Sequence, residues 1–175
     1  MNRTLLAVVL AAMVALAGCS ALTGSPDGSD ADTETPASGE QVAVADDSTD
    51  ATDVNQTVRL VVDETTNGSE WEAIGVTYPR ENFTVDSAQH DEIELGVDTN
   101  GDGEIDREFD ESHVSGVNNN AYSFDVTLDT DYTLRTGDVV VVQYPAVDNP
   151  AEPGEYEVEV RLNDRQNATG TVSIE

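Results

Sequence analysis

The residues best suited to chemistry in this chain lie in one short acidic segment. It reads Asp98-Thr99-Asn100-Gly101-Asp102-Gly103-Glu104-Ile105-Asp106. Side chains that carry oxygen atoms recur at alternate positions, and glycines stand between them. Carboxylate, amide and carbonyl oxygens are the ligands that a hard cation such as Ca²⁺ takes, and glycine allows the sharp turn around one ion. The spacing therefore predicts a calcium-binding loop.

The pattern D-x-N-x-D-G-x-x-D resembles the first part of an EF-hand loop. The resemblance implies a ligand set made of the side chains of Asp98, Asn100, Asp102 and Asp106 and the backbone carbonyl of Glu104. The twelfth position, where an EF-hand has a bidentate glutamate, is Phe109. Without that ligand we expect a weak, structural site, with a Kd of about 10⁻⁴–10⁻³ M.

The segments on both sides of this loop predict strands rather than the helices of an EF-hand. Ile93, Leu95 and Val97 alternate with other residues before the loop, and Ile105, Arg107 and Phe109 continue the two-residue period after it. The loop should therefore close a β-hairpin. The dipeptides Asn100-Gly101 and Asp102-Gly103 are hairpin-turn sequences in their own right. An acidic turn without an ion thus stays open as the alternative.

The overall charge excludes one class of partner and indicates an environment. The 175 residues include 36 Asp and Glu against 7 basic residues, a formal net charge of −29, and every basic residue is arginine. Such a chain repels phosphate backbones, so we expect no nucleic-acid partner. The absence of lysine and the abundance of aspartate resemble proteins of halophilic archaea. This resemblance implies a life in brine, where salt screens the self-repulsion of the chain.

The N-terminus predicts export and anchoring. A short start containing Arg3 precedes an apolar run, 5–16, that is too short to span a bilayer comfortably. The run ends in Leu16-Ala17-Gly18-Cys19, which resembles the lipobox of lipoproteins. The resemblance implies that residues 1–18 are a signal peptide and that a lipid on Cys19 holds the protein on the outer face of the cell membrane.

Residues 19–53 predict a spacer between this anchor and the folded domain. From residue 24 to 53 the sequence is confined to small, polar and acidic residues with valine and proline, and it contains no basic residue. Such a composition cannot bury a core, so we expect a disordered acidic tether. The folded domain is then expected to span 54–175.

The pattern of apolar and polar residues in 54–175 predicts an all-β fold. Apolar residues alternate with polar ones in eight or nine short runs that Asn, Asp, Gly and Pro separate. The continuous run 139–142 predicts a strand buried on both faces. These features indicate an antiparallel β-sandwich. The end of the chain, 144–158, resembles the final hairpin of prokaryotic surface Ig-like domains, which implies an Ig-like surface module.

Other candidate sites are weaker. Four N-x-S/T sequences make Asn55, Asn67, Asn82 and Asn167 candidates for glycosylation, although polar hairpins also produce such sequences. His90 and His113 are the only histidines, and no cysteine or H-x-x-H spacing accompanies them to suggest a zinc site. A blue-copper site needs two histidines and a cysteine, and the only cysteine here is Cys19 of the lipobox, so such a site is excluded. Trp71 and Tyr78 either flank a sugar-binding cleft or belong to the core.

The sequence thus favours a non-enzymatic, lipid-anchored module of a halophile's cell surface with a weak Ca²⁺ site. Its expected partners are the membrane, through the lipid, and a cell-surface protein or glycan; its oligomeric state is not predicted. The alternative is a ligand-binding or sensing lipoprotein that presents a pocket to a solute or transporter. A small hydrolase is a third hypothesis, and no catalytic residues are assigned.

Overall fold

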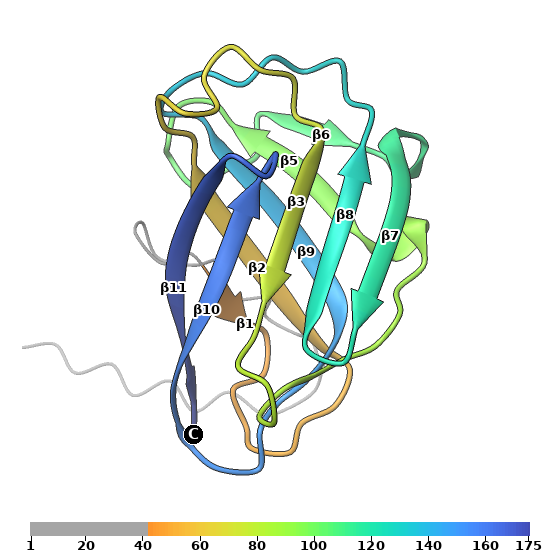
Figure 1. The fold of residues 1–175 in the computed structure, drawn as a ribbon, viewed down its shortest axis with the longest axis vertical. Helices are drawn as coiled ribbons and strands as arrows, with labels where there is room; N and C mark the ends of the chain where they lie inside the picture. Colours follow the sequence, from red (N-terminus) through yellow and green to blue (C-terminus); the bar gives the residue numbers. More distant parts are fainter. Residues whose placement is uncertain (1–41) are drawn as a thin grey trace, which may run out of the picture. The chain divides into compact units, whose positions relative to one another are not determined.

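A computed structural model describes residues 42–175 as two antiparallel β-sheets packed face to face (Figure 1). The first sheet has the order β1-β2-β9-β5-β6, with the short strand β4 on β9, and the second has the order β11-β10-β3-β8-β7. The strands are β1 (Val42–Val44), β2 (Val54–Val61), β3 (Ala73–Thr77), β4 (Thr84–Val85), β5 (Glu94–Asp98), β6 (Arg107–Phe109), β7 (Val114–Asn120), β8 (Ser123–Leu128), β9 (Val139–Asp148), β10 (Gly154–Leu162) and β11 (Gln166–Ile174).

This arrangement confirms the predicted all-β, Ig-like antiparallel sandwich. Eleven strands are present among the described residues, where the sequence predicted eight or nine. The only helical elements of residues 42–175 are two 3₁₀ turns, η1 (His90–Glu92) and η2 (Glu111–His113). No helix in this part of the chain is long and apolar enough to cross a bilayer.

The two-residue period of the strands builds the core. Alternate residues of each central strand point between the sheets, and the central strand β9 contributes Val140 and Val142, both fully buried. In the middle of the core the rings of Phe124 and Tyr144 stack with centroids 4.0 Å apart. Trp71 is 0% exposed and belongs to the same core, so the sugar-binding cleft considered from the sequence is not present at this residue.

The two strands that the sequence did not predict are edge strands. β7 is rich in Asn and Gly, which are typical of turns, and it forms because β8 offers a full row of backbone partners. β1 lies in the segment predicted to be a tether and pairs with β2. Val42 is 2% exposed in this position.

The folded part therefore includes Val42–Val44 and does not begin at Val54 as expected. The segment after β1 is also fastened to the end of the chain, because the Glu175 N–H donates to Asp47 and the Thr49 N–H donates to the Glu175 carbonyl. The Asn149 side chain donates to the carbonyl groups of Asp46 and Ser48. The sequence of this segment is poor in apolar residues, so it predicted no structure. The segment is ordered because β2, Asn149 and Glu175 provide its hydrogen-bond partners. The rest of the predicted tether, 19–41, lies outside the described residues.

Deletion of residues 42–53 is expected to lower the free energy of unfolding by about 2 kcal/mol. The variant loses the buried Val42 and the backbone pairing of β1, and this loss is partly offset by the entropy of a freed segment. Urea unfolding in molar NaCl measures the change. A deletion of the same length inside the acidic segment, 24–35, is the control and should leave stability unchanged. Equal effects of the two deletions would show that β1 contributes nothing.

Turns between the strands use acidic residues in an unusual backbone conformation. Within residues 42–175, six residues other than glycine have a positive φ, and five of them are Asp or Asn: Asp50, Asp53, Asp131, Asn163 and Asp164. The left-handed region is disfavoured for most side chains and is tolerated best by Asn and Asp. These aspartates therefore serve the chain's turns as well as its charge.

Candidate functional site

The acidic segment predicted to bind calcium joins β5 to β6 and lies against the outer face of the first sheet. The strands on both sides confirm the expected hairpin. Ile105 is not part of β6, as its spacing suggested, and instead packs over Gly96. A Cβ atom at Gly96 would lie 2.4 Å from Ile105 Cγ2, so only glycine allows the loop to approach the sheet this closely. The loop helps to cover Val141, which explains why β9 is buried on both faces.

Asp98 is the centre of the loop and is fully buried. Its Oδ1 atom accepts hydrogen bonds from the backbone N–H groups of Asn100 (3.2 Å) and Gly101 (2.6 Å). Its Oδ2 atom accepts from the Gly103 N–H and from Arg59 Nη2, both at 2.9 Å. A carboxylate offers about four lone-pair positions, and here all of them face a donor.

Arg59, on β2, supplies the positive charge that the loop encloses. Its guanidinium group is 9% exposed, its ion pair with Asp98 measures 2.9 Å, and its Nη1 atom donates to the Gly103 carbonyl at 3.2 Å. No other ion pair within residues 42–175 has both side chains so deeply buried. Sequence reasoning did not find this residue, since 39 positions separate it from Asp98. Its one signal was an arginine in the middle of a strand of a chain with only 7 basic residues.

The pKa of Asp98 follows from this environment. Burial by itself raises the pKa of the carboxyl group, but the hydrogen bonds from Gly103, Gly101 and Asn100 and the charge of Arg59 outweigh it. The pKa lies below the usual value of 3.8. Asp98 is therefore ionised at neutral pH although it is buried.

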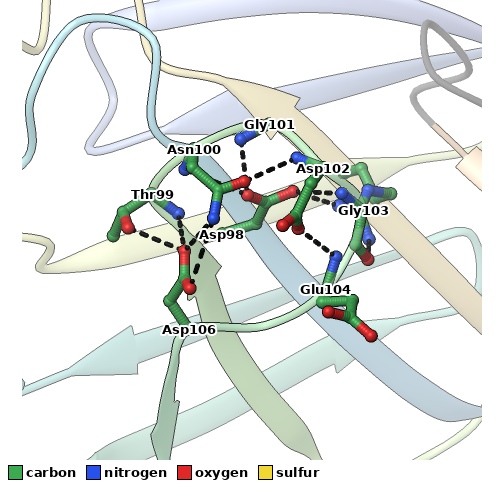
Figure 2. Close-up of polar contacts among 9 residues, drawn as sticks. Asp98, Thr99, Asn100, Gly101, Asp102, Gly103, Glu104 and Asp106 are labelled. Carbon is green, nitrogen blue, oxygen red and sulfur yellow. Dashed lines mark hydrogen bonds and ion pairs between the residues drawn. The ribbon is translucent and has the colours of Figure 1, made fainter.

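The other predicted ligands, Asn100, Asp102, Glu104 and Asp106, are exposed residues of the same loop (Figure 2). Asn100 Oδ1 accepts from the Asp102 N–H at 2.9 Å, and Asp102 Oδ1 accepts from the Glu104 N–H at 3.0 Å. Asp106 Oδ2 accepts from the backbone N–H and the hydroxyl of Thr99 at 2.8 and 2.7 Å. The side chains thus fold the loop by bonding its backbone.

The ligand types of this loop suit Ca²⁺, but their arrangement in the structure does so only in part. The oxygens of Asn100, Asp102 and Asp106 and the Glu104 carbonyl are hard ligands and lie on one loop. Asp98, the first expected ligand, already faces a guanidinium group and three N–H groups. A metal ion would have to compete with Arg59 for this carboxylate.

A second acidic group lies elsewhere on the surface. Within 42–175, the carboxylate oxygens of Glu70, Asp129 and Asp131 come within 4.8 Å of one another, and all three residues are exposed. This group could hold a metal ion. The three aspartates of the loop do not form such a cluster in the described part of the chain.

Next to the loop, a groove of about 570 Å³ follows β5 and β6. Its apolar part is formed by Ile93, Leu95, Ile105 and Phe109, and its carboxylates come from Asp91, Glu94, Glu108, Asp110 and Glu111. A smaller hollow on the other side of Ile105 shares Glu108 with it and contains Arg59. The groove could not be predicted from the sequence, because its residues come from β5, β6, the two 3₁₀ turns and the segments that connect them.

The remaining predicted sites are spread over the molecule. Asn67, Asn82 and Asn167 are exposed in or beside turns, whereas Asn55 is half-buried in β2. Glycosylation at any of them stays a prediction. Cys19, with the signal sequence, lies outside the described residues.

Comparison with known proteins gives distant similarities in shape only. No protein family and no curated protein matches the chain. Among solved structures, a bacterial hydrophobin, BslA, aligns with a TM-score of 0.42 and 13% identity over 77% of this chain and 98% of its own. The collagen binding subdomain of the Enterococcus faecalis surface protein ACE aligns with a TM-score of 0.40 and 11% identity over 81% and 99%.

A group B streptococcus pilus 2b backbone protein aligns with a TM-score of 0.44 and 15% identity, over 76% of this chain and 56% of its own. This chain thus corresponds to about half of that pilus protein. At such identities and TM-scores the comparisons assign neither a family nor a function.

Proposed function

We propose that the protein is a lipid-anchored, non-enzymatic β-sandwich module on the cell surface of a halophile. The observation that carries this proposal is the sequence Leu16-Ala17-Gly18-Cys19 followed, after an acidic segment, by a sandwich that begins near Val42. A diacylglycerol group on Cys19 would hold the chain at the membrane, and the acidic segment would set the sandwich at a distance from it. The net charge of −29 suits a surface that must stay soluble in strong brine.

The packing supports a structural role over a catalytic one. The aromatic side chains that could bind a substrate, Trp71, Tyr78 and Tyr144, are at most 2% exposed and fill the core. A role in binding, adhesion or spacing, with a cell-surface protein or glycan as partner, fits such a module. Labelling of the expressed protein with a radioactive lipid precursor tests the anchor. Label on the wild type and none on Cys19→Ser is the expected result, and equal label on both would refute the anchor.

As part of this function, the loop from Asp98 to Asp106 binds Ca²⁺ weakly and stabilises its hairpin. Asn100, Asp102, the Glu104 carbonyl and Asp106 would hold the ion, and Asp98 would join them where Ca²⁺ displaces Arg59. At a calcium concentration ten times Kd, mass action stabilises the folded state by about 1.4 kcal/mol.

About 10 mM CaCl₂ is therefore expected to raise the Tm of the full-length protein by about 3–6 °C relative to EDTA in 1 M NaCl. Asp102→Ala should abolish this shift, because Asp102 is exposed and its removal takes away a ligand with little effect on the fold. Thermal melts followed by circular dichroism measure the shift.

Asp129→Ala is the matched control, since Asp129 is an exposed aspartate of the second acidic group. It should keep the calcium shift. If only Asp129→Ala lost the calcium shift, the ion would be assigned to the second acidic group. If the wild type showed no shift, the loop would be an acidic turn closed by Arg59 and not a calcium site.

The second candidate function is that of a ligand-binding accessory. The specific observation in its favour is the groove of about 570 Å³ beside β5 and β6, a volume typical of small-molecule sites.

A further inference from the structure

The groove beside β5 and β6 combines an apolar floor with a rim of carboxylates. Five acidic residues line it, and no basic residue does. Ile93 and Leu95 are buried beneath its surface, while Ile105 is half-exposed and stands over Gly96. An apolar surface surrounded by charges of one sign favours a ligand of opposite charge that also has apolar parts.

Four of the five carboxylates have no partner within residues 42–175. Asp110 is held by the Ser112 N–H at 3.0 Å and the His113 ring at 2.9 Å. The carboxylates of the other four make neither a hydrogen bond nor an ion pair in the described structure: Asp91, Glu94, Glu108 and Glu111.

In the neighbouring hollow the chain provides its own positive charge beside a carboxylate. There Arg59 reaches between the loop and β9 and pairs with Asp98. The groove shares Glu108 and Ile105 with this hollow but contains no arginine. Arg107 Cζ lies 5.2 Å from the ring centroid of Phe109, but Arg107 does not line the groove. A cation that pairs with the carboxylates of the groove would therefore come from outside.

The chain's own segments cannot supply that charge. Residues 1–41 contain one basic residue, Arg3, and many acids, and a second copy of the chain brings a further net charge of −29. Electrostatic repulsion disfavours both as occupants. An external cation with apolar parts remains.

We propose that this groove binds a linear aliphatic polyamine. Such a molecule has ammonium groups that can pair with carboxylates and runs of methylene groups that can lie on an apolar surface, and both kinds of side chain line the groove. The ammonium groups would pair with Glu94, Glu108 and Glu111, and the methylene groups would lie on Ile105 and its apolar neighbours. This inference names the ligand class for the second candidate function and rests on the same groove, but it does not depend on the lipid anchor or on calcium.

Isothermal titration of the full-length protein with spermine, in neutral detergent and 1 M NaCl, tests the proposal. At this salt concentration the Debye length is about 3 Å, so diffuse attraction to the acidic surface is largely screened. One spermine per chain is expected to bind. The double variant Glu94→Gln/Glu108→Gln should weaken binding about tenfold, because it removes two of the pairing charges.

The matched control is Glu157→Gln/Glu159→Gln. These two residues are exposed on β10, in the other sheet, and the variant changes the net charge by the same amount. It should leave the affinity within about twofold of wild type. Equal weakening by the two double variants would overturn the proposal, because spermine would then be a counter-ion of the whole surface.

Two further probes test the chemistry of the ligand. Hexaamminecobalt(III) has a high charge and no methylene groups, so it should bind at least about tenfold more weakly than spermine. Equal affinity for hexaamminecobalt(III) and spermine would overturn the polyamine assignment, because the groove would then bind any cation of high charge. A pentalysine peptide that bound more tightly than spermine would also overturn it, in favour of a basic peptide.

Discussion

Asp98→Ala is expected to lower the free energy of unfolding by about 3–5 kcal/mol, the cost of breaking a buried ion pair from one side. The substitution leaves the Arg59 guanidinium, 9% exposed, without its carboxylate. It also removes the acceptor of three backbone N–H groups that fold the loop. Urea unfolding of wild type and variant in molar NaCl measures the difference.

Asp106→Ala is the matched control, because it removes an aspartate of the same loop that is exposed and bonds Thr99. We expect it to cost about 1 kcal/mol or less. The double variant Arg59→Met/Asp98→Ala should be more stable than Asp98→Ala alone, since no charge is then left buried and unpaired. If Asp98→Ala costs no more than Asp106→Ala, the buried pair does not hold the loop.

The ion pair of Arg59 and Asp98 also predicts how the stability of the protein depends on pH. Because the pKa of Asp98 is lower in the folded protein than its usual value of 3.8, ionised Asp98 stabilises the fold at pH values above 3.8. This contribution is lost as the pH falls below 3.8 and through the lower pKa of the folded state. The stability difference between wild type and Asp98→Asn should therefore shrink over this acidic range.

Trp71→Ala is expected to cost about 3–5 kcal/mol, as large-to-small changes of core aromatic residues do. Trp71 is 0% exposed, and its ring meets that of Phe109 edge to face with centroids 5.6 Å apart. Its backbone N–H also donates to Tyr132. The cavity left by the indole ring would lie between the sheets, where neighbouring strands cannot close it. Equilibrium unfolding followed by circular dichroism measures the loss.

Trp71→Phe separates the ring's packing from its polar atom. The indole Nε1 atom is buried and has no hydrogen-bond partner within the described residues. Removal of an unsatisfied donor offsets part of the lost contact area, so this variant should lose only about 1–2 kcal/mol. A Trp71→Ala protein within about 1 kcal/mol of wild type would contradict the core assignment and return Trp71 to the candidates for ligand binding.

The sequence predicted the elements whose pattern is local. Alternation of apolar and polar residues along β2, β5, β8 and β10 marks them as strands, and the hairpin around the acidic loop follows from its two flanking strands. In β10 the polar face is exposed, whereas Arg59 of β2 and Asp98 of β5 are buried beneath the loop. β1 and β7 could not be predicted in this way. Their residues are ordinary for turns and spacers, and their structure depends on β2 and β8, which provide the hydrogen-bond partners.

The same distinction applies to the site. The positions of Asp98 to Asp106 on one loop follow from their adjacency in the sequence. The position of Arg59 beside the loop and the formation of the groove both depend on which strands are neighbours in the sheet. The pattern of residues along the sequence does not show the order of the strands in a sheet. The pairing of β2 with β9 and of β9 with β5 brings Arg59 to the loop.

The aspartates with positive φ limit how the negative charge of this protein could be reduced. Charge can be removed from a strand face, for example at Glu155 or Glu157, without any change in backbone preference. At Asp50, Asp53 or Asp131 the same exchange, to serine or lysine, meets a conformation that those residues adopt less readily. Surface charge and chain reversal thus share residues in this protein. A variant of lower charge would need asparagine or glycine at these turns, and its neutral residues could be chosen more freely along its strands.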